Sequence, residues 1–141
     1  MNRHAKIDRL GQAKNVGLWA LQIFTAGAFV MAGYAKLAGD PMMEATFEKI
    51  GMGQWFRYVT SGIEIIAAVL LVIPRLAPAG AFLLLSTMIG AVLAHVVLLG
   101  GSPMPALVLG GFAGIILLGR WDTVKEWLAK GFGASERLSS V

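Results

Sequence analysis

Long apolar runs, separated by short breaks that contain proline or glycine, dominate the pattern along this chain. The runs span about residues 16–35, 56–73, 79–99 and 104–119. Each approaches the ~17–25 residues that an α-helix needs to cross a hydrocarbon core. Because the breaks after the second and third runs are short, successive helices must be antiparallel. The pattern therefore predicts an all-α membrane protein, an antiparallel bundle of four transmembrane helices.

The long first loop has a helical pattern of its own. Asp40 followed by Pro41 is typical of a helix cap and a first helical residue. Three apolar residues then recur on one helical face, at Met43, Phe47 and Ile50. We expect a short amphipathic helix that lies on the outer mouth of the bundle.

Basic residues are distributed unevenly about the four runs. Nine of the twelve Lys and Arg residues lie in the two tails and the second loop. The positive-inside rule therefore predicts that both termini are cytoplasmic and that the first loop is outside. The expected divisions are a basic tail at 1–15, the transmembrane domain at 16–119, and a cytoplasmic amphipathic segment and tail at 120–141. A signal peptide is the competing interpretation of the first run, but its apolar region would be shorter.

Composition supports a membrane protein and narrows its chemistry. The chain is 57% hydrophobic and 14% charged, with a mean hydropathy of +0.71, which favours a membrane protein over the alternative of a soluble all-helical protein with an exceptional core. It has no cysteine, which excludes disulfides and thiolate chemistry on this chain. The net charge of +4 comes from bases at the ends of apolar runs, so we expect no nucleic-acid partner.

Polar residues within the runs fall on shared helical faces, which we expect to point into the bundle because polar groups facing lipid are costly. Four charged or titratable residues lie in the outer half: Lys36, Arg57, Glu64 and His95. Candidate lining residues are Gln22, Thr25, Tyr34, Ser61 and Met88. Two interpretations stay open. Glu64 pairs with Lys36, Arg57 or His95 and fixes helix register, or the cluster is a proton-responsive or ligand-binding cavity open to the outside.

Metal and nucleophile chemistry have little support in the sequence. His95 is the only histidine within the apolar runs, and no second ligand stands three or four residues away. We therefore expect no metal site. A serine nucleophile is equally unsupported, because no histidine lies at useful helical spacing from Ser61.

Five short motifs occur in a recognisable order: Gly33-x-x-Lys36-Leu37, Phe47-x-x-x-Gly51, Gly62-x-Glu64, Leu71-x-x-Pro74-Arg75 and Met88-x-x-Ala91-x-x-x-His95. Their order and spacing resemble the DoxX and DoxX-like family of small four-helix bacterial membrane proteins. The resemblance implies a protein of the bacterial inner membrane with a link to redox physiology. Some relatives are subunits of thiosulfate:quinone oxidoreductase, and others associate with thiol-stress and superoxide-detoxifying partners. The matching polar positions are Lys36, Glu64 and His95.

The leading hypothesis is a multi-pass accessory subunit that binds a quinone or a lipid within a membrane redox or oxidative-stress assembly. Lys36, Glu64 and His95 would form its polar site, with Arg57 as a charge partner. A bound quinone is the expected cofactor, and a redox protein or a second copy is the expected partner besides the bilayer. The chain is not expected to be an enzyme on its own. Two other hypotheses stay open: a small proton-coupled transporter that uses Glu64, and a scaffold or assembly protein without a ligand.

Overall fold

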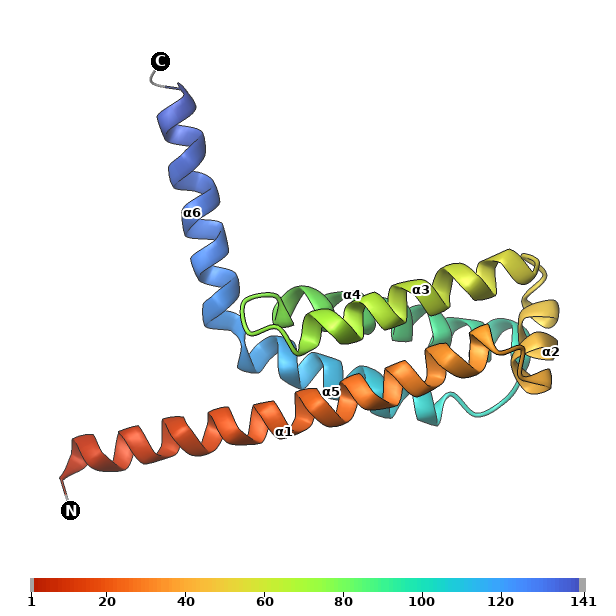
Figure 1. Ribbon diagram of the computed structural model, residues 1–141, viewed down its shortest axis with the longest axis horizontal. Helices are drawn as coiled ribbons and strands as arrows, with labels where there is room; N and C mark the ends of the chain where they lie inside the picture. The colour runs from red at the N-terminus through yellow and green to blue at the C-terminus, as the bar shows by residue number, and fades with distance from the viewer. Residues whose placement is uncertain (1, 140–141) are drawn as a thin grey trace.

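The computed structural model describes residues 2–139, which are built of helices and turns with no strand. The elements are α1 (Arg3–Leu37), α2 (Pro41–Ile50), α3 (Gln54–Leu71), α4 (Ala77–Ala94), the π-helical turn η1 (His95–Leu99), α5 (Met104–Gly119) and α6 (Trp121–Ser139) (Figure 1). The predicted all-helical class is confirmed. Met1 and residues 140–141, the outermost parts of the predicted tails, lie outside the described residues.

Four helices pack around one core. α1 packs along α3, α3 along α4, and α4 along α5, while α5 returns to α1. Large side chains fill the centre, and Phe29, Leu71, Leu84 and Ile116 are all fully buried. Many large apolar side chains point outward instead, as expected of a protein whose solvent is lipid.

Within residues 2–139, two helices are long and apolar enough by themselves to cross a membrane. These are α1 and the continuous segment Ala77–Leu99, which joins α4 to η1. A third candidate is α5 together with α6, although the two are bent by 58° at Arg120. α3 carries Arg57 and Glu64 within its 18 residues, which lowers its hydropathy.

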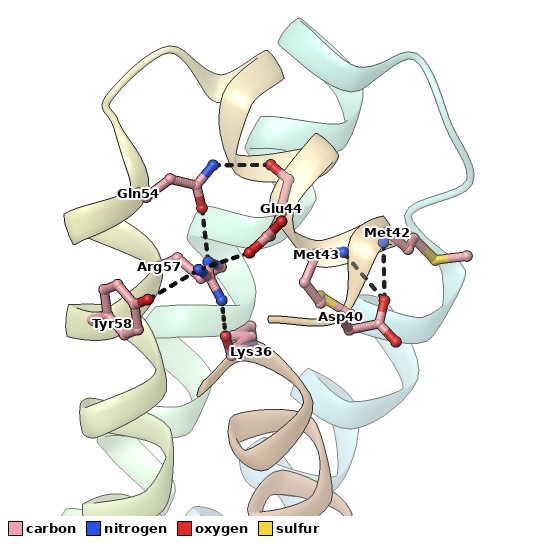
Figure 2. A network of polar contacts seen from close by, with 8 residues as sticks. All are labelled: Lys36, Asp40, Met42, Met43, Glu44, Gln54, Arg57 and Tyr58. Carbon is pink, nitrogen blue, oxygen red and sulfur yellow. Dashed lines mark hydrogen bonds and ion pairs between the residues drawn. The ribbon is translucent and has the colours of Figure 1, made fainter. Parts of the chain in front are cut away.

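The predicted first-loop helix is present as α2, which lies across one end of the packed helices (Figure 1). Asp40 caps it, since its Oδ1 accepts hydrogen bonds from the backbone N of Met42 at 2.9 Å and of Met43 at 3.4 Å (Figure 2). Phe47 is buried on the predicted apolar face. Gly51 ends the helix with φ +80°, a conformation that glycine adopts without strain.

Two boundaries differ from the sequence pattern. α1 begins at Arg3, so most of the expected tail at 1–15 is a helical extension of the first apolar run. No proline interrupts this segment, and a helix that is already formed extends at little cost. The second difference is at the end of the run at 79–99, which closes in the π-helical turn η1. Gly100 caps this turn, and its N donates to His95 O at 2.9 Å.

α3 and α4 approach each other closely at Gly80. A Cβ atom at this position would lie 2.5 Å from the backbone O of Ala67 and 2.9 Å from the backbone N of Leu71. Real Cβ atoms essentially never make such contacts. Glycine at position 80 therefore sets the distance between these two helices.

Candidate functional site

A buried ion pair joins α1 to α3. The Nζ of Lys36 lies 2.5 Å from Oε2 of Glu64, and the two side chains are 12% and 3% exposed. Ser61, one turn before Glu64, donates its hydroxyl to the backbone O of Gly33 at 2.8 Å across the same interface. Of the three partners that the sequence allowed for Glu64, the structure selects Lys36.

Arg57 makes a separate network at the end of the bundle that α2 covers, here called the α2 end (Figure 2). Its side chain is buried and donates to Gln54 Oε1 at 2.7 Å, to the backbone O of Lys36, and to Tyr58 OH at 3.2 Å. Its counter-charge is Glu44 of α2, with Nη2–Oε1 at 3.4 Å. Arg57 thus ties together α2, α3 and the end of α1, and it is not bonded to Glu64.

Three members of this network were not identified from the sequence. Glu44 lies in the first turn of α2, while Gln54 and Tyr58 lie three residues before and one residue after Arg57. Gln54 also donates to the backbone O of Glu44 at 3.1 Å. The spacing of Gln54 and Arg57 on one helical face was the only signal available.

His95 stands apart from both ion pairs. Its Nδ1 lies 2.8 Å from the backbone O of Ala91, one turn earlier on α4. Because a carbonyl oxygen only accepts, Nδ1 carries the proton, and in the neutral ring Nε2 therefore presents a lone pair. His95 also begins η1, and π-helical turns are frequent at functional sites.

An open apolar groove of about 250 Å³ lies between α4 and α5. Its walls include Met88 and Val92 of α4 together with Ala106, Gly110 and Gly111 of α5. His95 follows Val92 by three residues and Met88 by seven, so it lies on the same face of α4, beyond the groove's last lining residues. An apolar groove with a single polar group at its end suits a long amphiphile.

The sequence profile of the DoxX-like family matches residues 20–120. The match covers most of the chain and includes α3, α4, α5 and the part of α1 from Ala20 onward. This chain belongs to the DoxX-like family. No curated protein and no solved structure matches it. Membership, together with the apolar helices, makes the chain a membrane protein.

The remaining lining candidates of the DoxX-like chain take no part in the ion pairs at the α2 end. Tyr34 is 66% exposed and points out of the core. Thr25 is buried, and its hydroxyl has no hydrogen-bond partner among the described residues. Gln22 is buried near the middle of α1, about 21 Å from Lys36 at the helical rise per residue. None of the three joins the Lys36–Glu64 pair.

Gln22 instead belongs to a second polar cluster of the DoxX-like chain, at the end of the bundle opposite α2. Its Nε2 donates to the backbone O of Leu71 at 2.7 Å, and its Oε1 accepts from Arg120 Nε at 2.8 Å. The sequence pattern did not identify this cluster, because Gln22 and Arg120 are 98 residues apart. Within residues 2–139, no group of three His, Asp or Glu side chains could hold a metal ion.

Proposed function

We propose that this DoxX-like chain crosses the bacterial inner membrane four times, through α1, α3, α4 and α5, with both termini in the cytoplasm. The closed packing of these four helices supports the proposal. The two charges within α3 are each paired, which lowers the cost of placing them at membrane depth. Nine of the twelve Lys and Arg residues lie in the two tails and the α3–α4 turn, as the positive-inside rule requires of cytoplasmic segments.

Cysteine labelling tests this orientation without background, since the chain has no cysteine of its own. Ala45 on α2 and Ala129 on α6 are both exposed and suit single replacements. In intact spheroplasts, a membrane-impermeant maleimide is expected to label Ala45→Cys and to leave Ala129→Cys unlabelled until the cells are permeabilised. Labelling of Ala129→Cys in intact spheroplasts would reverse the orientation.

Within that topology, the chain acts as an accessory subunit that binds a quinone in the groove between α4 and α5. The observation that carries this function is the apolar groove with His95 beyond its end. The isoprenoid tail would lie against Met88 and Val92, and the ring against Nε2 of His95. The neutral imidazole accepts a hydrogen bond from a hydroquinone hydroxyl, and the protonated imidazole donates one to a quinone carbonyl. A bound quinone supplies two-electron redox chemistry, which a partner protein would complete.

Filling the groove tests the quinone site directly. Gly111 lines the groove, and a Cβ there would meet no atom within 4 Å, so Gly111→Leu places a side chain in the groove without a clash at its Cβ. This variant is expected to lower the quinone that co-purifies with the protein about tenfold, equivalent to ~1.4 kcal/mol of binding free energy. Native mass spectrometry and solvent extraction measure the ratio of quinone to protein.

The matched control is Gly114→Leu, one turn further along α5. Its Cβ also meets no atom within 4 Å, and Gly114 is not among the residues that line the groove. This control should keep its quinone, whereas His95→Phe should lose part of it through the missing hydrogen bond. Equal quinone content in the two leucine variants, or none in the unaltered protein, would rule out the groove.

The Lys36–Glu64 pair favours a structural role for Glu64 over proton-coupled transport. A carboxylate that carries protons must gain and lose charge in each cycle, and here it would have to separate from an ammonium group at 2.5 Å each time. A ligand-free scaffold is the function that would remain if no quinone binds.

A further inference from the structure

Arg120 is held rigidly between α5 and α6. Its Nε donates to Gln22 Oε1 at 2.8 Å, and its Nη1 donates to Asn15 Oδ1 at 2.7 Å. Its guanidinium also lies over the ring of Trp19, 5.7 Å from the centroid. Gln22 is completely buried, and its Nε2 bonds to the backbone O of Leu71. Its amide orientation is therefore fixed with the oxygen towards Arg120.

Among residues 2–139, Arg120 forms no ion pair. Its hydrogen-bond acceptors are neutral amide oxygens, whereas Lys36 and Arg57 at the α2 end each pair with a glutamate. The Nη2 of Arg120 is buried and has no acceptor among residues 2–139. Burial lowers the pKa of the Arg120 guanidinium, since desolvation penalises its charged form. The guanidinium of Arg120 is therefore positioned to bind an anion that residues 2–139 do not supply.

The start of α6 places Arg120 at a membrane surface. Val124 of α6 is half-buried, and α6 packs against both α4 and α5. Trp127, Leu128 and Phe132 continue the same apolar stripe and line a shallow groove of about 310 Å³ that only α6 residues border. α6 leaves the bundle at an angle of 58° to α5 and extends away from its end (Figure 1). Amphipathic helices with aromatic residues on the apolar face lie at the boundary of headgroups and acyl chains.

We infer that Arg120, held by Gln22 and Asn15, binds the phosphate of an anionic phospholipid in the leaflet on which α6 lies. Guanidinium groups bind phosphate oxygens through parallel charge-assisted hydrogen bonds. The apolar stripe of α6 would rest among the acyl chains of the same leaflet, next to the bound headgroup. The site lies at the opposite end of the bundle from the α4–α5 groove with His95, so it stands or fails independently of quinone binding.

Lipid exchange measured by native mass spectrometry tests this site. The purified full chain is equilibrated with mixed micelles of phosphatidylglycerol and phosphatidylcholine, and the bound lipids are counted. We expect the unaltered protein to retain phosphatidylglycerol in preference, and Arg120→Gln to lower that bound fraction about tenfold. Arg120→Lys keeps the positive charge but loses the planar, forked donor geometry of the guanidinium, so this variant should retain an intermediate amount of phosphatidylglycerol.

The matched control is Lys125→Gln, which removes one positive charge close by on α6. Lys125 is 66% exposed and makes only a surface pair with Asp122 at 3.6 Å, so its loss should leave lipid retention unchanged. If Arg120→Gln and Lys125→Gln lowered the bound phosphatidylglycerol equally, the lipid would be responding to overall surface charge, and the site at Arg120 would be ruled out.

Two measurements on the unaltered protein do not depend on how the variants fold. Phosphatidylglycerol should raise its thermal unfolding midpoint more than phosphatidylcholine does, because a ligand that binds only the folded state stabilises it. Millimolar inorganic phosphate should not displace the bound lipid. Equal midpoints with the two lipids, or displacement of the lipid by inorganic phosphate, would overturn the lipid assignment.

Discussion

Replacing Glu64 with alanine is expected to destabilise the folded protein by about 3–5 kcal/mol. The substitution leaves the ammonium group of Lys36, which is 12% exposed, without a counter-charge in the interface between α1 and α3. An unpaired charge in such a position costs far more than the net stability that an ion pair supplies. The measurement is the unfolding free energy in mixed micelles titrated with a denaturing detergent.

Two variants separate charge from packing in this experiment. Lys36→Met combined with Glu64→Leu removes both charges and keeps similar volumes, so most of the stability should return. Glu44→Ala removes an acid that is 52% exposed and leaves Arg57 its hydrogen bonds to Gln54, to Tyr58 and to the backbone O of Lys36, so it should cost less than Glu64→Ala. If Glu64→Ala were no more harmful than Glu44→Ala, the ion pair would not hold α1 against α3.

Gly80→Ala is expected to cost about 3 kcal/mol or more, at the upper end of the range for overpacked cores. The added methyl group meets backbone atoms of α3, at Ala67 O and Leu71 N, and these cannot rotate away as a side chain could. α3 and α4 must therefore separate along part of their length. The loss should appear as a lower thermal midpoint and a smaller unfolding free energy in the same detergent titration.

Gly90→Ala is the control on the same helix. A Cβ at Gly90 would meet no atom within 4 Å, so the methyl group has room. Alanine is a better helix former than glycine by roughly 0.5–1 kcal/mol, and this variant should be neutral or slightly stabilised. A similar loss in both variants would mean that an added methyl group is harmful at either place on α4, and that the close approach to α3 at Gly80 does not set the effect.

The helices of this protein could be predicted from its sequence because their signals are local. The apolar runs predict the core helices. The pair Asp40–Pro41 predicts the start of α2, because an N-cap bonds only to backbone groups two or three residues away. The start of α1 was placed too late, since the hydropathy falls before Val16 although nothing there breaks a helix. The π-helical turn at His95 depends on a one-residue shift in backbone hydrogen bonding, which no side-chain pattern records.

The candidate site was only partly predictable. Helical periodicity places Lys36, Arg57, Glu64 and His95 in the outer half, yet it cannot choose which of the other three pairs with the carboxylate of Glu64. That choice depends on α2, whose Glu44 lies against Arg57 and leaves Lys36 for Glu64. Residues on one face of a helix can still lie far apart along its axis, so the sequence pattern grouped Gln22 with Lys36, about 21 Å away on α1. Its actual partner, Arg120, lies near the far end of the chain.

The unbroken course of α1 has a mechanical consequence. Its 35 residues extend about 52 Å, whereas a hydrocarbon core is about 30 Å thick. The first turns therefore project beyond the packed helices as a stiff rod (Figure 1). Anything attached at Asn2 would be held at a set distance and angle, and each residue inserted into the rod would swing it by about 100° around the axis. The continuous helix thus fixes the direction of this end relative to the packed helices, whereas a flexible tail would leave that direction free.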